Sequence, residues 1–134
     1  MNAIKMMTCA LAMVAITLTP ALNAKDGASG TRLRAKLTGP AIATVTPMGE
    51  AQFKSNTLGN RSELEVEVEH VSLPAGTALD VQVKGVSVGT IKLHTSGEGE
   101  LDLDSQSGAA VPAVVKGDTV SVLNAGVVIM TGVF

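Results

Sequence analysis

Residues 63–69 constrain the fold of this chain more than any other stretch, because their polarity alternates at every position. Apolar Leu64, Val66 and Val68 are separated by glutamates along the whole segment. Successive side chains of a strand point to opposite faces, so this pattern puts the apolar residues in a core and a row of carboxylates in water. A helix would spread the same apolar residues around its circumference. The segment therefore predicts a β-strand with one buried face and one acidic face.

The alternation continues as far as Leu93, and residues 63–93 predict a three-stranded antiparallel meander. Residues 73–77 contain a proline and a glycine, which favour the first turn. Lys84-Gly85 predicts a tight second reversal. Gly89 lies where the alternation slips by one residue, which predicts a β-bulge.

Shorter alternating segments lie on both sides of this meander, and no segment has a helical period. They predict strands over residues 31–37, 50–54, 100–104, 119–123 and 127–134. Residues 39–49 predict a crossing loop, and residues 111–115 an irregular edge segment. Phe53 and Phe134 are the two aromatic residues, so the core must consist mainly of aliphatic side chains, and Phe134 is expected to fill part of it. The predicted fold class is all-β, a small antiparallel β-sandwich of about eight short strands.

An internal similarity supports this layout. Residues 76–88 resemble residues 117–129, which lie 41 positions later, and residues 63–66 resemble residues 100–103. Either an ancestral unit was duplicated, or two related meanders of one sandwich converged on similar sequences.

Residues 1–24 predict an export signal. Lys5 gives a positive start, residues 6–18 are almost uninterruptedly apolar, and small residues precede a cleavage site after Ala24, with Ala21 as the alternative. The apolar run is shorter than the roughly 20 residues that a membrane span needs. Cleavage leaves residues 25–30 as a flexible leader and residues 31–134 as one domain. The predicted location is periplasmic or extracellular, and the mature chain is predicted not to span a membrane.

The charge and composition of residues 25–134 exclude several functions. Nine basic and twelve acidic residues give a net charge of −3, unlike the basic surface of a nucleic-acid-binding protein. Cys9 is removed with the signal, and His70 and His94 are the two histidines, expected roughly 16 Å apart in the predicted meander. Zinc and type-1 copper sites are therefore not expected. No serine, histidine and acid arrangement resembles a catalytic triad, so we predict no enzyme and no cofactor.

The acidic residues give one candidate metal site. Glu100, Asp102 and Asp104 alternate along a predicted strand, with Glu98 in the turn before it, and the four would form a second acidic row beside residues 63–69 if the two strands are neighbours. Carboxylate oxygens are the ligands that calcium prefers. The competing interpretation is a solvated face. The acidic residues are also expected to pair with the basic strand that holds Arg32, Arg34 and Lys36, because opposite charges across strands are stabilising.

Residues 37–39 (Leu-Thr-Gly) and 46–53 (TPMGEAQF) resemble the opening of the CHRD (chordin-type) domain. That family has a similar Leu-x-Gly, a proline-containing loop and a Gly-x-Ala-x-Phe before an alternating strand. The resemblance covers fewer than 20 residues of the 134, and the histidine motif of the later part of that family has no counterpart here. It implies an extracellular all-β domain with no catalytic residues. The longer pattern is also similar to secreted bacterial β-modules.

The sequence therefore predicts an exported, non-enzymatic β-sandwich that acts as a structural, adhesive or envelope-associated binding domain for a protein or matrix partner. Two alternatives remain open at this point. One is a periplasmic carrier that holds a small apolar ligand between its sheets, and the other is an extracellular module stabilised by calcium.

Overall fold

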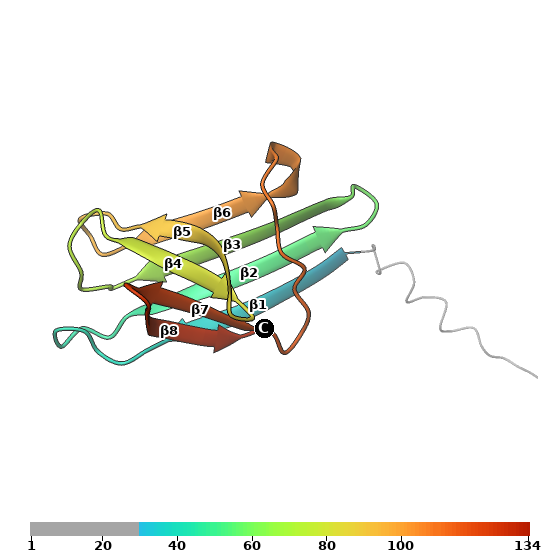
Figure 1. Ribbon diagram of the computed structural model, residues 1–134. Coiled ribbons are helices and arrows are strands. Elements are labelled where there is room, and N and C mark those ends of the chain that lie inside the picture. Colours follow the sequence, from blue (N-terminus) through green and yellow to red (C-terminus); the bar gives the residue numbers. More distant parts are fainter. Residues whose placement is uncertain (1–29) are drawn as a thin grey trace, which may run out of the picture. The chain divides into compact units, whose positions relative to one another are not determined.

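The computed structural model describes residues 30–134. They form eight strands and one short 3-10 turn (Figure 1): β1 (Gly30–Thr38), β2 (Met48–Asn56), β3 (Arg61–Glu69), β4 (Ala78–Val83), β5 (Val86–Lys92), β6 (Gly99–Asp104), η2 (Ser105–Ser107), β7 (Thr119–Asn124) and β8 (Val127–Val133). The all-β prediction is confirmed. The predicted signal (residues 1–24) and all but the last residue of the predicted leader lie outside the described residues.

All eight strands belong to one antiparallel sheet, in the order β5-β4-β7-β8-β1-β2-β3-β6. The sheet folds over, so that β5-β4-β7-β8 forms one layer and β1-β2-β3-β6 the other (Figure 1). The layers are joined where β8 pairs with β1, with Thr131 opposite Thr38. On the other side the edge strands approach each other, since a Cβ on Gly99 would lie 2.5 Å from Cγ2 of Ile91. This arrangement is the small sandwich-like fold that the sequence predicted.

The predicted meander over residues 63–93 is wrong in one respect. β4 and β5 form the expected hairpin, but β3 pairs with β2 and β6 instead of β4. The connection after β3 does not turn back along the strand, because buried Val71 and half-buried Leu73 pack against the core. The Val71 amide also donates to the carbonyl of Gly97, 3.0 Å away. The chain therefore crosses from one layer to the other between β3 and β4.

The internal similarity corresponds to two hairpins of matching geometry, β4–β5 and β7–β8. Their strands have equal lengths and start 41 positions apart. Both turns have two residues with positive φ, Lys84 and Gly85 (55° and 79°) and Ala125 and Gly126 (50° and 83°). These angles match the type I′ turn that two-residue hairpins favour.

The two hairpins also pair with each other through a local two-fold arrangement. β4 lies antiparallel to β7, with Val81 opposite Val122, and these two residues are themselves 41 positions apart. The register shifts immediately after Val81 in the first hairpin and immediately after Val122 in the second. The extra residue of the first bulge is Val88, so the bulge predicted at Gly89 is found one residue away.

The core contains the apolar residues that the alternation predicted. Leu64, Val66 and Val68 of β3 are fully buried, and Phe53 and Phe134 are 5% and 7% exposed. The segment after η2 is irregular, as predicted, and places Val114 against the core. With the inward side chains packed in this way, the outward side chains of the two layers form the surfaces that remain for binding.

Candidate functional site

The outer face of β3 and β6 places carboxylates directly opposite one another. Their register pairs Glu63 with Asp104, Glu65 with Asp102, and Glu67 with Glu100. Like charges directly opposite across strands are destabilising. We call these six outward residues the acidic face. The condition on which the candidate calcium site depended, that the two acidic strands are neighbours, is thus met.

At one end of the acidic face the charges are neutralised. Arg61 donates two hydrogen bonds to Asp104, of which Nε to Oδ1 is 3.1 Å, and its Nη2 lies 3.6 Å from Glu63. Lys54 of β2 lies 3.6 Å from the other oxygen of Glu63. The hydrogen bond from Arg61, assisted by the amide of Gln106, holds the pKa of Asp104 below its usual value. This end of the face is a surface ion-pair network.

Further along the same strands the acidic face has no such partner. Among residues 30–134, no basic side chain forms an ion pair with Glu65, Glu67 or Glu100. One carboxylate oxygen from each of these three residues lies within 4.8 Å of one from each of the others. We call them the carboxylate trio. Three converging carboxylates attract a positive charge, and their oxygens are suitable ligands for calcium or magnesium.

The structure does not bring the four predicted calcium ligands together as one set. Glu100, Asp102 and Asp104 are alternate residues of β6, and among the described residues neither Asp102, Asp104 nor Glu98 belongs to a group of three converging carboxylates. Asp104 is held by Arg61, and its side chain caps η2 by accepting from the amide of Gln106. Only Glu100 joins the carboxylate trio, and its partners come from β3. These partners could not be identified from the sequence alone, because they depend on the pairing of β3 with β6.

A basic strand does not lie beside the acidic face, contrary to the expectation that the two would pair. β2 separates β1 from β3 in the sheet. Arg34 of β1 lies 3.8 Å from Glu50 of β2, and Arg32 donates a 2.7 Å hydrogen bond to Gln52. Only Glu63 is reached from β2, by Lys54. The basic and acidic strands therefore share one face of the molecule at a distance from each other.

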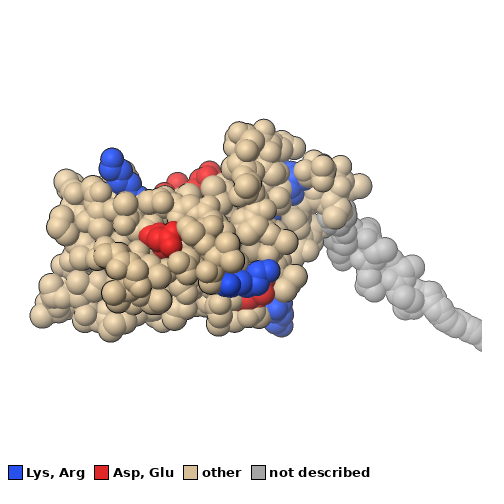
Figure 2. All heavy atoms as spheres, in the orientation of Figure 1, with Lys and Arg blue, Asp and Glu red and all other residues tan. Residues whose placement is uncertain are grey.

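The two layers differ strongly in the number of charged side chains on their outer surfaces. Figure 2 views the molecule from the side of β4, β5, β7 and β8, where charged side chains are few and scattered. The outward residues of β4 there include Asp80, which accepts hydrogen bonds from Gln82 and Ser87 and is thus locally satisfied. The concentration of charge belongs to the layer of β1, β2, β3 and β6.

The two histidines line different cavities. The distance expected between them assumed that β3 pairs with β4, and that pairing does not form. His94 lines a cavity of about 340 Å³ next to the carboxylate trio, with Glu67, Glu69, Glu98 and Glu100 also on its wall. His70 lines a second cavity of about 420 Å³.

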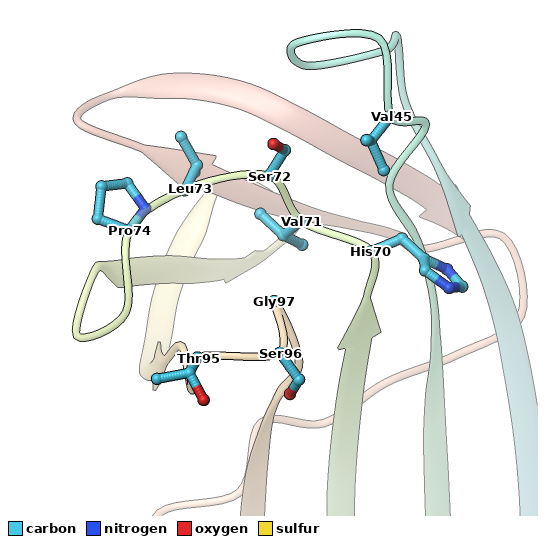
Figure 3. A pocket seen from close by; sticks show the side chains of 9 residues that line it. All are labelled: Val45, His70, Val71, Ser72, Leu73, Pro74, Thr95, Ser96 and Gly97. Atoms are coloured by element: carbon cyan, nitrogen blue, oxygen red, sulfur yellow. The ribbon is translucent and has the colours of Figure 1, made fainter.

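The cavity at His70 does not resemble a binding site for a specific small molecule. It lies between the connection after β3 and the turn before β6, where His70 has a left-handed backbone (φ 58°). Figure 3 shows that the hydroxyl of Ser72 points away from those of Thr95 and Ser96, so its polar groups do not converge. Of the sites described here, the carboxylate trio is therefore the one with a defined chemistry.

Comparisons with known proteins add no family to this picture. No family model matches the chain, and no curated protein sequence matches it. Within residues 30–134, no helix has the length and apolar character needed to cross a membrane.

Proposed function

We propose that this chain is an exported, non-enzymatic β-module that acts by binding a positively charged partner on its acidic face. The export signal and the resemblance to extracellular β-domains are predictions from the sequence, and they support a structural, adhesive or envelope-associated role. The observation that carries the proposal is the carboxylate trio, in which Glu67 and Glu100 are directly opposite and form no ion pair with a basic side chain among the described residues.

The part of the acidic face that lacks ion pairs, Glu65, Glu67 and Glu100, disfavours folding of the isolated domain. Cross-strand pairs of like charge destabilise a sheet by an amount comparable to the roughly 0.2–1 kcal/mol that favourable pairs contribute. The same carboxylates would gain attraction from any cation or basic group placed over them. A role in binding accounts for this arrangement, whereas a role in folding does not.

Replacing Glu67 and Glu100 with glutamine is expected to stabilise the isolated domain. The variant E67Q/E100Q keeps the side-chain size and removes the repulsion, so its free energy of unfolding should rise by about 0.5–1 kcal/mol at low ionic strength. The gain should shrink in about 1 M salt, where charges are screened within roughly 3 Å. Urea unfolding in the presence of a chelator measures both values, and a loss of stability in the variant would show that these carboxylates serve the fold.

A calcium ion is the second candidate occupant, favoured by the 4.8 Å convergence of three carboxylate oxygens. Calcium that binds only the folded protein should raise its melting temperature, since a ligand at 100 times its dissociation constant stabilises by about 2.7 kcal/mol. E100Q is expected to abolish the shift. E98Q is the matched control, because Glu98 lies beside the trio without belonging to it. An equal melting temperature in calcium and in chelator would exclude this candidate.

The third candidate from the sequence, a carrier of a small apolar ligand, requires a cavity between the two layers. The inward side chains of β3 and β4 are fully buried or nearly so, as are those of β7. The cavities at His70 and His94 lie among connections and strand ends, but another cavity, of about 360 Å³, is lined by the core residues Phe53 and Val114 together with Thr31, Ser55, Ser62 and residues 111–113. The carrier function stays a prediction from the sequence, and this cavity is where its ligand would be sought.

A further inference from the structure

We propose that the partner of the acidic face is a second copy of this chain, docked face to face through the layer β1-β2-β3-β6. The inference rests on the proposed function, because it names the positively charged group that meets the acidic face: Arg32 and Arg34 on β1 of the second copy. The order of charges across the four strands, from cations on β1 to anions on β6, brings opposite charges together when it is reversed.

Two rows of side chains cross this face at right angles to the strands. The first contains Arg34, Glu50, Glu67 and Glu100, placed by the contact of Arg34 with Glu50 and by the registers of β2 with β3 and β3 with β6. The second contains Arg32, Gln52, Glu65 and Asp102, placed in the same way. Each row begins with a cation on β1 and ends with an anion on β6.

The positive and negative ends of each row are too far apart to neutralise each other. Three strand spacings separate β1 from β6, or about 14 Å, which exceeds the Debye length of about 8 Å at physiological ionic strength. The contact between Arg34 and Glu50 is long, and both side chains are about half exposed. Arg34 can therefore turn towards another molecule at little cost.

A two-fold axis parallel to the strands reverses the strand order of the second copy. It then places β1 of one copy over β6 of the other, so that Arg34 faces Glu100 and Arg32 faces Asp102 of the second copy. The same rotation places β2 over β3, which brings Lys54 to Glu63. It also brings Glu50 to Glu67, the one pair of like charges in these rows. Within the two rows two opposite-sign pairs stand against one like-sign pair, Glu65 faces the neutral Gln52, and Lys54 with Glu63 adds an opposite-sign pair from the next row.

Pairing through the edge of β6 is a less favourable way to associate. The outward side chains of this edge strand are Glu100, Asp102 and Asp104, and an acidic edge discourages edge-to-edge pairing of identical strands. A face-to-face dimer instead uses the acidic residues. Its stability depends on charge, so the expected association is weak and sensitive to salt.

Sedimentation equilibrium at about 10 mM and about 1 M salt tests the inference. The wild-type chain should form a dimer at low salt and a monomer at high salt. R32E/R34E should be monomeric at both, and so should E100R/D102R. The mixture of these two variants should form a heterodimer at low salt, because β1 and β6 are both acidic in the first variant and both basic in the second. The control K92Q/K116Q removes two cations outside the proposed interface, since neither residue lies on β1, β2, β3 or β6, and it should behave as wild type.

A wild-type monomer at low salt, or a variant mixture that does not associate although both variants unfold cooperatively, would overturn the inference. That result is distinguishable from failure of the proposed function. If native mass spectrometry still shows a bound mass that E67Q/E100Q lacks, the acidic face binds something other than a second copy. If no bound mass is found either, both proposals fail.

Discussion

Alanine in place of Gly39 is expected to destabilise the domain by about 3 kcal/mol or more, or to prevent folding. A Cβ on Gly39 would lie 1.8 Å from the carbonyl oxygen of Ile129, which is backbone and cannot turn aside. Gly132 of β8 is constrained in the same way, because a Cβ added there would lie 2.3 Å from the carbonyl oxygen of Lys36. Overpacking commonly costs about 1–3 kcal/mol, and here the clash falls where β1 and β8 join the two layers. Urea unfolding of G39A and G132A measures the loss.

Gly59 provides the control for these two substitutions. It lies in the turn between β2 and β3, and the nearest atoms to an added Cβ, on the side chain of Asn56, are 3.9 Å away. G59A should therefore unfold within about 0.5 kcal/mol of wild type, as surface substitutions usually do. Stability equal to wild type in G39A would show that β1 and β8 do not approach as closely as described.

The substitution F134A should lower the free energy of unfolding by about 3–5 kcal/mol, the range found when a buried phenylalanine is truncated. Phe134 is 7% exposed and belongs to the single core cluster. Its amide donates to the carbonyl of Asp118 (3.0 Å), and its carbonyl accepts from Gly117 (2.7 Å). The corresponding residue of the other hairpin, Leu93, makes the same two bonds with Thr77 and Gly76.

The control F134L separates the side chain from these backbone bonds. Leucine keeps them and most of the apolar volume, so the expected loss is below about 1.5 kcal/mol. Removal of residue 134 should be worse than F134A, because both hydrogen bonds are lost together with the ring. Thermal unfolding of the three variants gives the order, and an F134A variant as stable as wild type would place Phe134 outside the core.

The local features of the fold could be read from the sequence because each depends on neighbouring residues. Alternation at Leu64, Val66 and Val68 assigned the buried face of β3 correctly. Lys84-Gly85 identified a hairpin turn, and the spacing of 41 residues identified the second hairpin of the same geometry. Turn chemistry and side-chain parity are local properties, so no tertiary information was needed.

The strand partners could not be read in the same way. The alternation of β3 is compatible with pairing to β4 or to β6. The structure has the pairing with β6. In the connection after β3, Val71 is buried in the core instead of lying in a solvent-exposed turn. The residues of the candidate site could not all be predicted, because they depend on the same strand pairing. Glu100 was identified as a possible ligand, but its partners Glu65 and Glu67 follow from the register of β3 with β6, which is a non-local property.

Native mass spectrometry of the protein, purified gently from the cells that make it, tests the central claim most directly. The comparison is between the wild type and E67Q/E100Q, sprayed from a solution of low ionic strength. If the acidic face is the binding surface, the wild type carries additional mass from a bound cation or basic partner, and the variant appears at the mass of the chain alone. A wild type without additional mass, or a bound mass that the variant retains, would contradict the claim.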